Sequence, residues 1–201
     1  MEYYQNIITE KSFKELQKLR RRYKFILIGG WAVYLYTHSL KSKDIDIVID
    51  YDELNKLKRN FSVNKNDRLK KYEISREEID IDIYLPFYSH PGLPAESIEE
   101  YAREVEGFLV PSQECLLILK QKAYTARQGT AKGEKDKIDI ISLLQNELNV
   151  SEYKKILKKF NLSHYLFELK NILRITKEVD ELRLNQFRYS KLKKKYLPQL
   201  S

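Results

Sequence analysis

Two pairs of aspartates lie within short apolar segments of the 201-residue chain, at a spacing that suits metal-assisted chemistry. Asp44 and Asp46 alternate with isoleucines, and Asp80 and Asp82 repeat the arrangement. Because successive side chains of a strand point to opposite faces, each pair would share one face while the isoleucines share the other. Two such strands side by side would gather three or four mutually repelling carboxylates. A hard divalent cation would compensate that charge, and Mg²⁺ prefers oxygen ligands shared with substrate phosphates.

A glycine pair, Gly29-Gly30, precedes these segments and lies between an expected strand at 25–28 and an expected helix at 31–36. Residues without a Cβ let a phosphate approach the backbone N–H groups, and the helix N-terminus adds positive potential. Taken singly, a glycine pair is typical of ordinary turns and an Asp-x-Asp of solvent-facing strands. The ordered set instead favours a two-ion site that could hold the attacking and leaving oxygens of a phosphoryl or nucleotidyl transfer in line.

The sequence resembles the DNA polymerase β-like nucleotidyltransferase superfamily, and its layout looks most like the small prokaryotic abortive-infection and toxin–antitoxin members. The resemblance covers roughly residues 25–145 and is carried by three segments: Ile28-Gly29-Gly30-Trp31-Ala32, Asp44-Ile45-Asp46-Ile47 and Ile81-Asp82-Ile83-Tyr84. It implies a small mixed sheet and transfer of a nucleoside monophosphate from an NTP to a hydroxyl, with release of pyrophosphate.

The resemblance also implies roles for individual residues. Asp44 and Asp46 would bind two Mg²⁺ or Mn²⁺ ions, and the third carboxylate would be Asp82, with Asp80 as the alternative. The glycine pair Gly29-Gly30 would hold the triphosphate through backbone donors.

One segment departs from the family pattern, and a later one extends the resemblance to a nucleotide contact. Many relatives have an arginine four residues and a threonine two residues before the first aspartate, where this chain has Leu40 and Ser42; Lys41 and Lys43 could supply the missing positive charge. A later helical segment resembles one in which such proteins contact nucleotide through a lysine, here Lys120. The charged residues that follow it are open to either reading, as part of that segment or as surface charges: Lys135, Asp136 and Asp139.

The pattern of apolar residues predicts an α/β (α+β) fold, a small mixed β-sheet flanked by helices, followed by a helical C-terminal region. Expected helices cover 10–22, 31–36, 52–59, 112–127 and 134–148, and expected strands cover 25–28, 44–49, 72–74 and 79–85. The proline-rich segment 86–94 predicts a loop. Ser97-Ile98-Glu99-Glu100 fits a capping box and predicts that a helix begins there.

The formal charge of +8 is unevenly distributed along the chain. Residues 1–150 contain 24 Lys/Arg and 24 Asp/Glu, so the whole excess lies in 151–201. Together with the resemblance, this division predicts a nucleotidyltransferase domain at 1–149 and a basic helical region at 150–201 that could bind RNA, tRNA or an acidic protein partner. The single cysteine, Cys115, and the lack of a long apolar run predict a cytoplasmic protein with no membrane span.

The expected function is Mg²⁺-dependent nucleotidyl transfer to RNA or tRNA, a protein side chain or a small molecule. The alternative is a non-catalytic protein with the same fold, acting as an antitoxin-like partner or an RNA-binding module.

Overall fold

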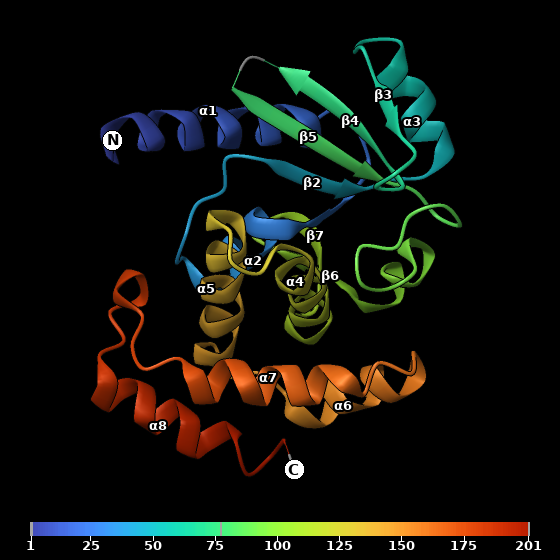
Figure 1. The fold of residues 1–201 in the computed structure, drawn as a ribbon. Helices are drawn as coiled ribbons and strands as arrows, with labels where there is room; N and C mark the ends of the chain where they lie inside the picture. The colour runs from blue at the N-terminus through green and yellow to red at the C-terminus, as the bar shows by residue number, and fades with distance from the viewer. Residues whose placement is uncertain (1, 77, 201) are drawn as a thin grey trace. The chain divides into compact units, whose positions relative to one another are not determined.

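The computed structural model describes residues 2–76 and 78–200, and the chain forms two compact units, Met1–Ser112 and Gln113–Ser201 (Figure 1). Its mixed α/β architecture is the expected one. The units divide at Ser112 rather than at the change of charge near residue 150, because the two helices that follow Ser112 pack with the C-terminal helices.

The first unit is built around a five-stranded mixed sheet with the strand order β1-β2-β5-β4-β3. Strands β2 and β5 are parallel neighbours, and the pairs β1–β2, β4–β5 and β3–β4 are antiparallel. The strands are β1 (Ile26–Ile28), β2 (Ile45–Val48), β3 (Asn64–Asn66), β4 (Lys71–Arg76) and β5 (Ile79–Tyr84). The predicted strands are thus present, and the short edge strand β3 is an addition that its polar residues did not signal.

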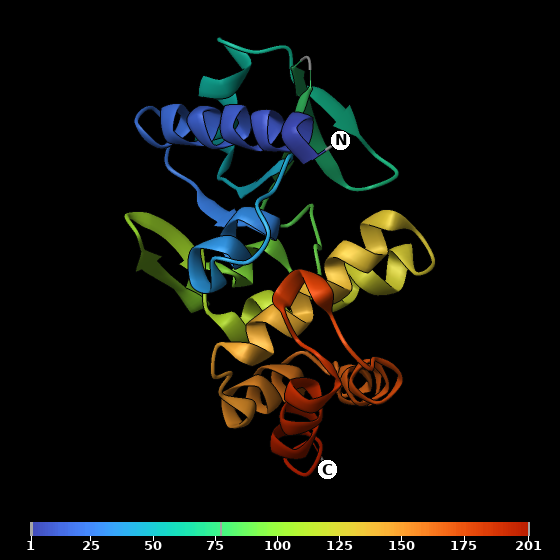
Figure 2. The same ribbon diagram turned by 90° about the vertical axis from the view of Figure 1, so that its left-hand side faces the viewer.

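Alternation along the two central strands separates an apolar face from a polar one. Ile45, Ile47, Ile81 and Ile83 are buried to 1% exposure or less. Helix α1 (Glu2–Arg20) flanks the strands (Figure 2), and the Arg76–Glu15 ion pair fastens it to β4 at an N–O distance of 3.0 Å. The aspartates that alternate with these isoleucines therefore lie on the opposite face.

Two further helices of this unit connect the strands. Helix α2 (Gly29–Thr37) begins at the glycine pair and is buried along most of its length. Helix α3 (Tyr51–Lys58) begins at Asp50, whose side chain accepts a hydrogen bond from the backbone N–H of Glu53, and it matches the expected helix closely.

The helix predicted from the capping box at Ser97 is wrong. The chain there forms two short 3₁₀ turns (Ala95–Ser97 and Glu99–Tyr101) and then the antiparallel hairpin β6 (Ala102–Val105) and β7 (Phe108–Pro111). Glu106 and Gly107 both have positive φ angles, 49° and 75°, which suits a two-residue hairpin turn. The hairpin forms because Phe108 is buried with Val110 beside that turn, an alternation typical of a strand.

The second unit is helical, as predicted for its C-terminal part. It comprises α4 (Gln113–Arg127), α5 (Ala131–Gln145), α6 (Val150–Lys159), α7 (His164–Ile175), a 3₁₀ turn (Asp180–Leu182) and α8 (Gln186–Tyr196). Gln121 links α4 to two of the other helices. Its amide oxygen accepts a hydrogen bond from the Tyr153 hydroxyl of α6, and its amide nitrogen donates one to the Tyr165 carbonyl of α7. Tyr196 of α8 donates to the Leu144 carbonyl of α5 at 2.7 Å.

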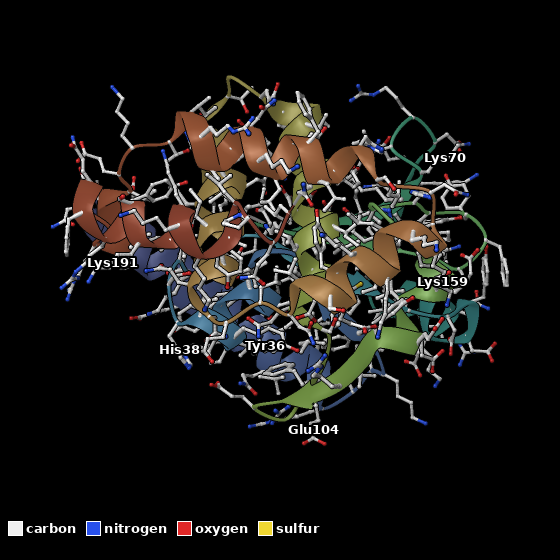
Figure 3. The ribbon with its side chains drawn as sticks, turned by 90° about the horizontal axis from the view of Figure 1, so that it is seen from below. Tyr36, His38, Lys70, Glu104, Lys159 and Lys191 are labelled. Atoms are coloured by element: carbon white, nitrogen blue, oxygen red, sulfur yellow. The ribbon has the colours of Figure 1, made fainter. Side chains whose placement is uncertain are left out.

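The basic residues of the C-terminal helices lie on their outer surfaces. Lys159 of α6 and Lys191 of α8, for example, are both exposed (Figure 3). Within the part of the chain that the structure describes, no helix is both long and apolar enough to cross a membrane.

Candidate active site

The central feature of the polar sheet face is a pair of aspartates at the same level of two adjacent strands. Asp46 of β2 and Asp82 of β5 are register partners in the parallel pair. Both side chains are partly buried, and Asp82 retains 19% exposure. Neighbouring strands lie about 4.8 Å apart, so this register places the two aspartates side by side on adjacent strands.

The other two predicted carboxylates differ in their placement. Asp44 precedes β2 by one residue, is partly buried, and its charge acts on Asp82. Asp80 is exposed near the start of β5, where its register partner is Ser75 of β4. The register thus places Asp82, not Asp80, opposite Asp46.

The glycine turn meets Asp46 directly. In the antiparallel pair of β1 and β2, Ile28 is opposite Asp46, and Gly29 follows with φ of +69°. A Cβ at Gly29 would lie 2.1 Å from Oδ2 of Asp46, so only glycine allows the carboxylate to lie against this backbone. The N-terminal end of α2, with its positive potential, therefore adjoins the carboxylate.

Two residues of β4, which the sequence reasoning missed, complete this face. Lys71 Nζ lies 2.5 Å from Oδ2 of Asp82 and 3.0 Å from Oε1 of Glu73, and the lysine side chain is only 12% exposed. Glu73 is the cross-strand partner of Asp82. The alternation of charged and apolar residues along β4 hinted at a polar face, but the register that brings Lys71 to Asp82 is a tertiary property.

The charges on this face perturb one another. Burial raises the pKa of Asp82, and the charges of Glu73 and Asp44 add to the rise, whereas Lys71 opposes it. Burial lowers the pKa of Lys71, but its bonds to Asp82 and Glu73 outweigh burial and raise that pKa above its usual value. The hydrogen bond from Lys71 holds the pKa of Glu73 below its usual range. Lys71 and the carboxylates thus form one electrostatic unit.

The donor chemistry of this face suits a hard cation, because carboxylate oxygens are the ligands that Mg²⁺ takes. The lack of a Cβ at Gly29 leaves room for the Asp46 carboxylate, on the strand next to that of Asp82. Among residues 2–76 and 78–200, however, no three Asp, Glu, His or Cys side chains are close enough together to hold a metal ion. At Asp82 it is the Lys71 ammonium that contacts the carboxylate.

The segment before β2 carries the other predicted nucleotide contacts of this unit. Ser42 is buried and Lys43 is exposed, both in the connection between α2 and β2. Gly30, the second residue of the glycine pair, is buried within the first turn of α2.

Lys120, in the second unit, is a buried cation paired with two aspartates. It lies on α4 with 7% exposure, and its Nζ is 2.6 Å from Oδ2 of Asp139 and 3.2 Å from Oδ1 of Asp136. Arg127 pairs with Asp136 at 2.6 Å. The interpretation of Asp136 and Asp139 as surface charges is wrong, because both are buried, at 2% and 0% exposure. Burial raises the pKa of Asp139, and Lys120 opposes that rise.

No protein family model matches the chain, and no curated protein matches it. Solved structures do. The antibiotic-resistance factor ANT(2'')-Ia aligns at a TM-score of 0.53 with 15% identity over 84% of this chain and 97% of its own. JHP933 from Helicobacter pylori aligns at 0.48 with 17% identity over 97% and 94%, and an antigenic nucleotidyltransferase-like protein from Paracoccidioides brasiliensis at 0.43 with 17% identity over 83% and 92%.

The chain is therefore an α/β protein built on a small mixed sheet. The likeness to the ANT(2'')-Ia structure shows that this chain has the nucleotidyltransferase fold. That fold is the one implied by the sequence resemblance.

Proposed function

We propose that the protein catalyses divalent-metal-dependent transfer of a nucleoside monophosphate from an NTP to a hydroxyl acceptor. One observation carries the proposal: Asp46 and Asp82 are register partners, and the glycine turn at Gly29 lies against the first of them. A phosphate at the turn would thus lie next to the carboxylates proposed to hold its metal ion. The nucleotidyltransferase fold supports this proposal.

In this proposal the aspartates hold the metal ions and the glycine turn holds the phosphates. Asp44 and Asp46 would hold two Mg²⁺ or Mn²⁺ ions, and Asp82 would complete the set on the acceptor side. When bound, the metal would lower the pKa of the acceptor hydroxyl and neutralise the triphosphate. The backbone N–H groups at Gly29 and Gly30 would hold phosphate oxygens at the positive end of α2.

The acceptor oxygen would form a bond to the α-phosphorus while the bond from that phosphorus to the bridging oxygen breaks. Pyrophosphate leaves with the electron pair, and Asp82 would take the acceptor's proton. Ser42 and Lys43 are proposed as further triphosphate contacts. Lys120 is proposed as a nucleotide contact on the resemblance alone, because its ammonium is paired with Asp136 and Asp139.

The acceptor is proposed to be a polyanion or an acidic partner. The second unit has 19 Lys/Arg and 10 Asp/Glu, so it carries the positive charge of the chain. RNA or tRNA is therefore the first acceptor to test, with a protein or a small molecule next. If RNA binds the basic region 150–201, its affinity must fall as salt rises. An affinity unaffected by salt would contradict this assignment.

The test is label transfer. The protein is incubated with each α-labelled NTP, Mg²⁺ and a cell extract, and label is sought in RNA, protein and small molecules. Asp46→Asn and Asp82→Asn should each abolish transfer, while Asp80→Asn, an exposed position on the same strand, should retain it. Loss in Asp80→Asn with activity in Asp82→Asn would reassign the third carboxylate. Binding of RNA or protein without any transfer or metal-dependent NTP binding would favour a non-catalytic binding protein instead.

A further inference from the structure

Lys71 is a partly buried cation at a site whose proposed chemistry assigns it no role. Its ammonium contacts Oδ2 of Asp82 at 2.5 Å and Oε1 of Glu73 at 3.0 Å. Asp82 has Glu73 as its partner on one side and Asp46 on the other. A face this rich in carboxylates is stable only with compensating positive charge, and in this structure Lys71 provides it.

The Lys71 ammonium lies on the same Asp82 oxygen that a metal ion would bind. Oδ2 of Asp82 accepts a short, charge-assisted hydrogen bond from Lys71, and hydrogen bonds of this kind are stronger than those between neutral groups. A divalent ion bound to the same oxygen would lie at about 2.0–2.1 Å from it. Two cations that close together repel strongly, so the ammonium and the metal cannot both contact Oδ2.

We propose that Lys71 is an internal counter-cation that competes with the divalent metal for Asp82 and so lowers the affinity of the site for metal. The proposal rests on the proposed function, because it requires Asp82 to be a metal ligand. Glu73 gives the displaced ammonium a second carboxylate on the same face. Lys71 thus remains beside the site, where its charge favours an anionic triphosphate over a bare metal ion.

The experiment is a direct titration of the purified 201-residue chain with Mn²⁺, followed by electron paramagnetic resonance of the free ion. Lys71→Met should bind Mn²⁺ about tenfold more tightly than the wild type, the factor expected when a hydrogen bond between charged groups no longer has to be broken. Lys71→Arg retains the charge and should keep the wild-type affinity to within about threefold.

Lys70→Met is the matched control. Lys70 is the exposed neighbour of Lys71 (Figure 3), and its removal takes away the same formal charge one residue along the chain. Solvent screens such an exposed charge, so its loss should leave Mn²⁺ affinity within about twofold of wild type. Equal tightening in Lys70→Met and Lys71→Met would indicate a general effect of net charge and would overturn the proposal.

Thermal unfolding provides a second measurement. Without metal, Lys71→Met should melt at a lower temperature than the wild type, because Asp82 and Glu73 then repel without compensation. Saturating Mn²⁺ should raise its melting temperature by more than that of the wild type. A lysine that only stabilises the fold would lower the melting temperature without tightening metal binding.

The outcomes separate this proposal from the proposed function. Saturable Mn²⁺ binding of equal or weaker affinity in folded Lys71→Met would refute the role of Lys71 and leave the metal site standing. No saturable binding in either the wild type or Lys71→Met would refute the metal site and, with it, the competition.

Discussion

Gly29→Ala is the substitution that most directly tests the geometry of the site. It adds one methyl group at a residue with φ of +69°, a left-handed conformation that costs a residue with a Cβ about 1–2 kcal/mol. The added Cβ would also lie 2.1 Å from Oδ2, 2.6 Å from Cγ and 2.8 Å from Cβ of Asp46. Since even the Cβ of Asp46 is too close, rotation of the carboxylate alone does not relieve the overlap.

The expected loss of unfolding free energy is therefore larger than the backbone cost. Forcing atoms into an occupied space typically costs a further ~1–3 kcal/mol, so Gly29→Ala should lose about 2–5 kcal/mol in total. It should also weaken Mn²⁺ binding and reduce label transfer on the order of 100-fold, because a displacement of about 1 Å at a catalytic group has that effect.

Gly129→Ala is the matched control for this prediction. Gly129 has φ of +75°, and a Cβ there would meet nothing within 4 Å. It bears the backbone cost alone, about 1–2 kcal/mol, and leaves the site unaltered. Urea unfolding of both variants measures the difference, and the double variant Gly29→Ala/Asp46→Ala should recover part of the loss, since it removes the two closest atoms.

A loss in Gly29→Ala no greater than that in Gly129→Ala, with Mn²⁺ binding unchanged, would refute the close contact between the glycine turn and Asp46. Loss of metal binding without extra destabilisation would show that the carboxylate moves freely.

Two further predictions concern the second unit. Lys120→Met should lower the unfolding free energy by about 3–5 kcal/mol, because it leaves Asp136 and Asp139 buried without their shared cation. Lys122 is exposed, so the control Lys122→Met should change the unfolding free energy by less than about 0.5 kcal/mol. Similar urea midpoints for the two variants would contradict the buried cluster. Burial raises the pKa of Tyr165 and Tyr189 to about 12 and that of Tyr153 still further. Unfolded tyrosine ionises near pH 10, so the unfolded state binds fewer protons above about pH 10 and stability must fall as pH rises beyond it. Circular dichroism melts between pH 8 and 11 should show this loss, with tyrosinate absorbance rising as the protein unfolds; unchanged melting temperatures would exclude the burial of these hydroxyls.

Local patterns predicted much of the first unit. The isoleucine–aspartate alternation correctly predicted β2 and β5 and which side chains face the core, since side-chain direction in a strand follows from its period of two. The glycine pair correctly marked the end of β1 and the start of α2. The helix predicted from the capping box at Ser97 is absent because the chain that follows forms the hairpin with its turn at Glu106-Gly107, which the four-residue pattern does not include.

The sequence by itself determined the set of groups available for chemistry: the two aspartate pairs, the glycine pair and the excess of positive charge toward the C-terminus. Only the tertiary structure decided how they combine. Strand order and register place Asp82 rather than Asp80 opposite Asp46, and bring Lys71 to Asp82 from a third strand. Helix packing buries Lys120 with Asp136 and Asp139, whose spacing is also typical of an exposed helix face. Alternation along one strand is a local property of the backbone, whereas register and burial depend on which distant segments pack together, and no single segment encodes that choice.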